Sequence, residues 1–191
     1  TFSGDWFLVV PLLGIVYELT NNALLTSTVL IVQSAPMVLF SSFGGYLADR
    51  YDRRLILTIS EFLSALAVLL VMYAVSTENV FYILSSYFML LLVNVAYMPT
   101  SDAALPNIVK REFLPEANVL FFSTWGIAAG LGAGLGGLLS SILTRNQLFT
   151  INFLSFVISA FLIFLIKTNL SEDRNKETTF ENTKLSDGLN F

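Results

Sequence analysis

The chain has 191 residues, of which 55% are hydrophobic and 13% charged, and its formal net charge is −4. Soluble domains carry roughly 25% charged residues, so this chain has too little polar sequence to cover a soluble core. It contains neither cysteine nor histidine, which excludes disulfides and thiolate metal sites and removes the usual zinc ligand and general base. We expect no cofactor, no metal and no nucleic-acid partner.

Long uncharged runs divide the chain, at residues 19–48, 62–77, 79–101, 117–144 and 146–166. About 20 apolar residues in a helix cross a bilayer. We therefore predict an all-α membrane protein with six transmembrane helices. Because the chain opens without Met or a basic leader, we expect it to start inside or just before its first helix. The predicted spans are 3–22, 24–48, 55–76, 79–99, 118–143 and 147–167.

Two polar segments lie outside these spans. The link at 101–117 contains Pro106 and Pro115 around a basic pair, and we predict a short amphipathic helix on the membrane surface there. Residues 168–191 are polar and mostly unpatterned, which is typical of a linker. The predicted organisation is a transmembrane unit over 1–167 followed by a cytoplasmic linker over 168–191.

Lys and Arg fall almost entirely on one side when the six spans alternate across the membrane. Cytoplasmic loops are rich in these residues, so this side is predicted to be cytoplasmic and to hold both ends of the chain, in the cell membrane. The other side receives only Arg145. The cytoplasmic set is Arg50, Arg53, Arg54, Lys110, Arg111, Lys167, Arg174, Lys176 and Lys184.

A cluster of charges interrupts the hydrophobic sequence after the second span. A basic loop that only holds the orientation is one interpretation of it. Two features favour a more specific role. Asp49 ends the span, where a carboxylate needs a partner, and Gly44 and Gly45, one turn earlier, allow another helix to approach closely. The charges are Asp49, Arg50, Asp52, Arg53 and Arg54.

The stretch "GYLADRYDRR" at residues 45–54 resembles G-x-L-x-D-R-x-G-R-R, the loop between the second and third helices of the major facilitator superfamily. The resemblance implies a cytoplasmic gate, in which the carboxylate matching Asp49 helps to lock two six-helix halves together. Asp52 departs from the family pattern, which usually has Gly there. The gate residues implied by the resemblance are Gly45, Asp49, Arg50, Arg53 and Arg54.

The fifth span contains the glycine-rich stretch "WGIAAGLGAGLGGLL". Glycines four residues apart let helices approach closely in lipid, and they form two rows here, Gly126, Gly130 and Gly134 in one and Gly132 and Gly136 in the other. A dinucleotide loop is excluded because no strand precedes the stretch and no acid follows at the required distance. The stretch resembles the G-P-x-x-G-G motif of antiporters in the same superfamily, although Ala133 replaces the proline. The matching residues are Gly132, Gly136 and Gly137.

Four acids lie within or near the spans: Asp5, Glu18, Glu61 and Asp102. An ionisable residue in a membrane helix is a functional candidate, while one near a span end can reach water or cap the helix. We expect the second role for Glu18 and Asp102. Asp5 and Glu61 are the candidates to line a cavity and carry protons, although each could instead reach the interface.

The segments "SGDWF", "VYELTNNAL" and "ALPNIVKREFLPEAN" resemble the macrolide-efflux and enterobactin-exporter branch of this superfamily. The end of the chain, "KLSDGLNF", resembles the segment before the seventh helix in that branch. The resemblance implies the N-terminal half of an MFS fold, built from two inverted three-helix repeats, that lacks its C-terminal six-helix partner. It implies proton-coupled efflux of small hydrophobic or amphiphilic molecules. An importer of a small solute is the alternative, and a membrane-embedded enzyme a remote one.

Overall fold

The computed structural model describes residues 2–168, 170 and 171. Its regular elements in this part of the chain are all helical. In chain order they are α1 (Phe2–Thr20), α2 (Ala23–Arg50), α3 (Arg53–Ser76), α4 (Val80–Val93), the 3-10 turn η1 (Asn94–Ala96), α5 (Tyr97–Ile108), the 3-10 turn η2 (Arg111–Phe113), α6 (Leu114–Ser140) and α7 (Arg145–Phe164).

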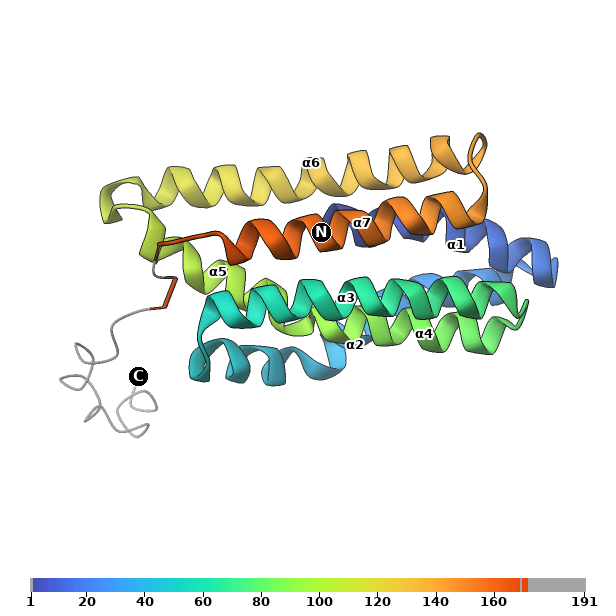
Figure 1. Cartoon of the computed structure of the whole chain (residues 1–191), viewed down its shortest axis with the longest axis horizontal. Helices are drawn as coiled ribbons and strands as arrows, with labels where there is room; N and C mark the ends of the chain where they lie inside the picture. Colours follow the sequence, from blue (N-terminus) through green and yellow to red (C-terminus); the bar gives the residue numbers. More distant parts are fainter. Residues whose placement is uncertain (1, 169, 172–191) are drawn as a thin grey trace, which may run out of the picture.

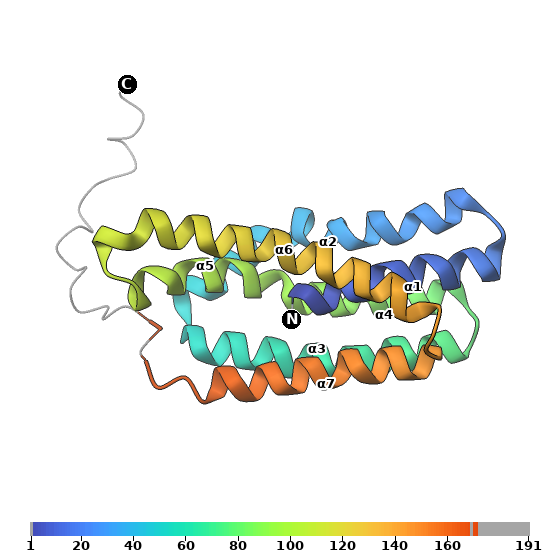
Figure 2. The same ribbon diagram turned by 90° about the horizontal axis from the view of Figure 1, so that it is seen from above.

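The helices lie side by side along the long axis of the molecule (Figure 1, Figure 2). Within the described residues, five helical segments are long and apolar enough to cross a membrane, and α4, η1 and α5 together make one of them. The shorter α1 begins about halfway along the bundle, so Asp5 in its first turn lies near the middle of the bundle's length (Figure 1).

The packing pattern divides the bundle into two three-helix repeats, α1–α3 and α4–α7. The first helix of one repeat packs along the second helix of the other: α1 along α6, and the α4–η1–α5 helix along α2. The third helices, α3 and α7, pack against each other. This exchange is the arrangement that a pseudo-twofold axis in the membrane plane produces. The predicted all-α fold is thereby confirmed as six helices in two three-helix repeats, with five of the helices long and apolar enough to cross a membrane.

The predicted surface helix at 101–117 is wrong. The fourth span continues past residue 99 as α5 and ends at Ile108, while α6 already begins at Leu114. Pro106 is placed in the last turn of α5, and Pro115 occupies the first turn of α6, where a missing N–H leaves no bond unmade. The two prolines therefore belong to the ends of spanning helices rather than to a separate helix.

Side-chain caps fix where several helices begin. Asn22, Asp52 and Asn79 accept backbone N–H groups at the starts of α2, α3 and α4, and Thr144 forms a reciprocal capping box with Gln147 at α7. Such caps satisfy N–H groups that have no partner within the helix.

Large hydrophobic side chains cover the outside of the bundle as well as its interior. The core lies mainly among α1, α3, α4 and α7, with Leu8, Leu12, Val68, Tyr87 and Phe156 fully buried. Many leucines, isoleucines and phenylalanines elsewhere are exposed. An apolar surface of this extent fits contact with lipid rather than water, so the chain is a multi-pass membrane protein.

The turns fall into two groups at opposite ends of the bundle. The turns after α2 and α5 and the end of α7 lie at one end, and the turns after α1, α3 and α6 lie at the other (Figure 1). Residues 172–191 lie outside the described residues, so the linker and the segment "KLSDGLNF" stay predictions.

Candidate functional site

A polar cluster crosses the interior of the bundle at the start of η1. The Nδ2 atom of Asn94 lies 3.2 and 3.4 Å from the two carboxylate oxygens of Asp5 in α1 and donates to them. Its Oδ1 atom accepts from the hydroxyl of Ser64 in α3 at 3.1 Å. The cluster therefore joins α1, α3 and the fourth helix through one amide side chain.

The second predicted acid, Glu61, belongs to the same region. It is fully buried in α3, one turn before Ser64, and residues three apart share a helix face. Asp5 interacts electrostatically with Glu61 and with Tyr87 of α4. The structure thus brings the two candidate acids together, although they are far apart in the sequence.

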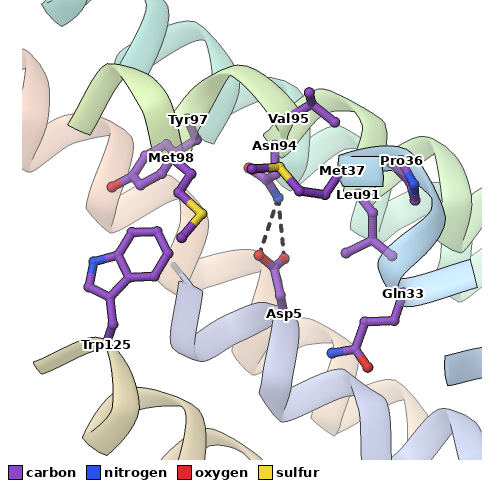
Figure 3. Close-up of a pocket in the computed structure, with 10 residues that line it drawn as sticks. All are labelled: Asp5, Gln33, Pro36, Met37, Leu91, Asn94, Val95, Tyr97, Met98 and Trp125. Carbon is purple, nitrogen blue, oxygen red and sulfur yellow. Dashed lines mark hydrogen bonds between the residues drawn. The ribbon is translucent and has the colours of Figure 1, made fainter. Parts of the chain in front are cut away.

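Asp5 and Asn94 form part of the wall of a pocket of about 130 Å³ (Figure 3). The Asn94 amide and the Asp5 carboxylate face each other across the centre of the view, and Trp125 of α6 and Gln33 of α2 stand at its two sides. The remaining wall is mostly apolar, and Pro36, which lies inside α2, contributes to it. The other residues that line the pocket are Met37, Leu91, Val95, Tyr97 and Met98.

Two arginines of the charged cluster donate to backbone carbonyl groups of neighbouring segments, Arg53 from a half-buried position and Arg54 from an exposed one. The guanidinium of Arg53 donates to the carbonyl oxygens of Ala103 in α5 at 2.8 Å and of Leu170 after α7 at 3.3 Å. Arg54 donates to the carbonyl oxygen of Ile166 at 2.6 Å. Ala103 lies within α5, whereas Ile166 and Leu170 follow the end of α7. Arg53 and Arg54 thus hold the segment that follows α7 against the start of α3, and Arg53 also holds α5 there.

The other members of the cluster face outward. Asp49 and Arg50 are exposed in the last turn of α2. The Arg50 guanidinium contacts the Tyr46 hydroxyl and lies 5.6 Å from the centre of its ring, a cation–π arrangement. This exposed face is separate from the carbonyl groups that Arg53 and Arg54 hold.

Asp52 stands where the motif that this loop resembles has glycine, and it caps α3. Its carboxylate accepts the N–H of Leu55 at 2.9 Å and the hydroxyl of Ser171 at 3.2 Å. Its φ of −63° is open to any residue. The turn therefore does not require glycine, and an N-cap carboxylate replaces it.

The glycines of α6 divide into two groups. Gly132 and Gly136 are buried, and a side chain at Gly136 would collide with the carbonyl oxygen of Phe7 in α1. Gly137 lies near Val10 of α1. The predicted antiporter-like residues are thus on the face that packs against α1. The other row is exposed and has open space around it: Gly126, Gly130 and Gly134.

The remaining sites fall near the helix ends. Glu18, near the end of α1, forms an exposed ion pair with Arg145 at the start of α7. Asp102 is exposed on α5. Of the two glycines before the charged cluster, Gly44 packs against Val95 of η1, whereas Gly45 has open space around it.

Three uncharged polar residues of the site were not among the sequence-based candidates, which were selected by charge: Asn94, Ser64 and Gln33. Asn94 is the one amide in the uncharged run "VFYILSSYFMLLLVNVAYM". A polar side chain in such a run is expensive in a membrane and signals a function or a partner. This signal was available in the sequence, but the identity of the partner was not.

Comparison with known proteins gives the family. The sequence model of the Major Facilitator Superfamily matches residues 1–189. The chain is 25% identical over 98% of its length to YfiS, an uncharacterised MFS-type transporter of Bacillus subtilis, and spans 45% of that protein. It is 25% identical over 90% of its length to a Na(+), Li(+), K(+)/H(+) antiporter of Planococcus maritimus, of which it spans 41%.

A third relative is BacE, a candidate bacilysin exporter of Bacillus subtilis, which is 28% identical over 87% of the chain. The chain spans 41% of BacE, so it covers less than half the length of each of these relatives. No solved structure shows significant similarity to it. The match of the family model to nearly the whole chain, together with these relatives, shows that the chain belongs to the major facilitator superfamily of membrane transporters.

Proposed function

We propose that this chain is the N-terminal six-helix half of a secondary transporter that works by alternating access. In such transporters the substrate binds near the bilayer midplane between two halves that rock against each other. The observation that carries the proposal is the pocket with Asp5 in its wall (Figure 3), near the middle of the bundle's length (Figure 1). The second half is the partner that would close this pocket. Since its relatives are transporters, the chain is not an enzyme.

We further propose efflux of small hydrophobic or amphiphilic molecules in exchange for protons. The apolar pocket wall suits an apolar substrate, with few polar groups to orient it. Asp5 and Glu61 are the proposed proton carriers, because carboxylates inside a membrane protein mark ion pathways. The antiporter and the candidate exporter among the relatives support this direction. No observation favours the importer alternative.

The proposed gate lies on the exposed face formed by Asp49 and Arg50. Arg53 and Arg54 would support it by fixing α5 and the segment that follows α7 against the start of α3. The proposed location is the cell membrane, and the end of the bundle that holds the turns after α2 and α5 is proposed to face the cytoplasm. Asp49→Asn should impair transport by the full-length protein and leave membrane insertion almost unchanged, because an exposed carboxylate contributes little to packing.

The test of function is efflux of a fluorescent amphiphilic cation, ethidium, from exporter-deficient bacteria that express the full-length protein. We expect faster efflux than in cells with an empty vector, and loss of the difference when a proton uncoupler is added. Asp5→Asn and Glu61→Gln should each slow the uncoupler-sensitive efflux at least tenfold. Glu18→Gln is the matched control, because it makes the same change at an exposed acid outside the pocket, so efflux should be unchanged. Unchanged efflux in both acid variants would exclude them as carriers.

A further inference from the structure

The fourth spanning helix is interrupted at the depth of Asp5. Its α-helical part ends at Val93, the 3-10 turn η1 follows, and α5 resumes at Tyr97. A 3-10 turn inside a helix often marks a functional hinge. Asn94 is the first residue of this turn, so the interruption places its side chain between α1 and α3.

The two hydrogen-bonding ends of the Asn94 amide have different partners. An ionised carboxylate only accepts hydrogen bonds, and both oxygens of Asp5 accept from Nδ2 of Asn94. The hydroxyl of Ser64 donates to the carbonyl end. With Asp5 ionised, this orientation satisfies every partner, because turning the amide over would set its oxygen against the carboxylate.

We infer that Asn94 is a positioning residue that stabilises the charged form of Asp5, with Ser64 fixing the orientation of the amide. The inference rests on the proposed role of Asp5 in carrying protons. Hydrogen bonds donated to a carboxylate favour its charged form, and they are stronger than bonds between neutral groups. Asn94 therefore sets the pH at which Asp5 takes up a proton, although it carries no charge itself.

The other groups that act on Asp5 have to be held constant in any test. Glu61 of α3 and Tyr87 of α4 interact with it electrostatically. Among the described residues, the neighbours from other helices are uncharged: Gln33 of α2 and Trp125 of α6 line the same pocket, and Asn152 of α7 donates to the carbonyl oxygen of Gly4 at 2.8 Å. Glu61 is thus the one further carboxyl group of this cluster that can react in place of Asp5, and Glu61→Gln removes it.

The experiment is labelling by dicyclohexylcarbodiimide, which reacts with protonated carboxyl groups in apolar surroundings. The full-length protein, carrying Glu61→Gln, is reconstituted in liposomes and labelled across a pH series, and modification of Asp5 is measured by mass spectrometry. Asn94→Leu should move the midpoint of labelling to higher pH by about one unit, a tenfold higher affinity for protons. Ser64→Ala should move it in the same direction by less.

Gln33→Leu is the matched control, because Gln33 lines the same pocket and makes no hydrogen bond to Asp5 among the described residues. The midpoint of Asp5 labelling should not move in this variant. Asn94→Gln keeps the amide, so it should raise the labelling midpoint by less than Asn94→Leu does. If Asn94→Leu fails to fold, Asn94→Ala takes its place. An unchanged midpoint in a folded Asn94 variant overturns the inference, and so does the absence of Asp5 labelling at every pH.

Labelling does not require transport, which separates this inference from the proposed function. Normal uncoupler-sensitive efflux by Asp5→Asn would reject proton carriage by Asp5. The midpoint shift in Asn94→Leu would still show whether the amide controls the carboxylate.

Discussion

Gly136 of α6 rests directly against the main-chain carbonyl of Phe7 in α1. The same relationship recurs in the other repeat, where Gly44 of α2 rests against the carbonyl of Val95 in η1. In each case the second helix of one repeat uses a glycine to approach the first helix of the other. Close approach of backbones is a main source of helix association in lipid, so these two contacts hold the repeats together.

Gly136→Ala should therefore destabilise the protein, whereas Gly134→Ala should not. The added methyl group at 136 meets a backbone carbonyl that cannot move without the whole of α1, and overpacking of this kind costs about 1–3 kcal/mol. Gly134 has open space around it, and alanine is the better helix former by about 1 kcal/mol. Thermal unfolding of the purified variants in detergent measures the stability of each. Equal melting temperatures for the two variants would contradict the proposed packing.

Gly44 and Gly45 give a second matched pair in adjacent positions of α2. Gly44→Ala should lower the melting temperature, because its methyl group would press on the Val95 carbonyl, while Gly45→Ala should be neutral or slightly stabilising. Gly44→Ala should also slow transport more than its stability loss explains, since it displaces the turn that holds Asn94. The measurement is efflux normalised to the amount of folded protein. Similar losses in both variants would show that the motif glycine Gly45 has a role outside this bundle.

These glycines also show how far the sequence could predict the structure. Charge distribution predicted the six helices and the sorting of their connections, because charges are excluded from the bilayer core. The glycine spacing predicted two close-packing rows in α6, but only the row with Gly132 and Gly136 packs within the described residues. Spacing identifies a face that can be approached. It does not say which neighbour approaches it.

The polar cluster shows the same limit. Asp5 and Glu61 could be selected from the sequence because a carboxylate in a membrane helix is costly. Asn94 carries no charge, and its contact with Asp5 joins residues 89 positions apart. That contact depends on how α1 lies against the fourth helix and on the 3-10 turn, neither of which hydrophobic pattern specifies.

Arg53 should be sensitive to replacement even by lysine. Its guanidinium spans two carbonyl groups on different segments, those of Ala103 and Leu170. Both bonds come from one nitrogen, Nη1, which the planar guanidinium holds in place. A lysine ammonium sits on a more flexible chain and loses more side-chain entropy when it is held between the same two oxygens. We expect Arg53→Lys to lower the free energy of unfolding by about 1–3 kcal/mol. Arg50→Lys, at an exposed position, should lower it by less than about 1 kcal/mol. Thermal unfolding in detergent compares them, and a larger loss in Arg50→Lys would contradict this assignment.

The proposed orientation can be tested with single cysteines, because the chain has none of its own. Lys110→Cys lies between α5 and α6, and Asn146→Cys lies in the first turn of α7 at the opposite end of the bundle. In intact cells a membrane-impermeant maleimide should label Asn146→Cys and spare Lys110→Cys. Inside-out vesicles should give the reverse pattern. Labelling of Lys110→Cys in intact cells would invert the proposed orientation.

The buried hydroxyl group of Tyr87 has no hydrogen-bond partner among the residues that the structure describes, although it lies near Asp5. A buried polar group without a partner has lost its bonds to water and gained nothing in return, a penalty of about 1–3 kcal/mol. Tyr87→Phe should therefore leave the melting temperature unchanged or raise it. Tyr97→Phe is the control, because the Tyr97 side chain lines the pocket and makes further interactions, so its loss should be neutral or destabilising. A clear fall in melting temperature for Tyr87→Phe would mean that the hydroxyl is bonded in the membrane, through water or a bound proton donor. That result would add Tyr87 to the polar cluster around Asp5.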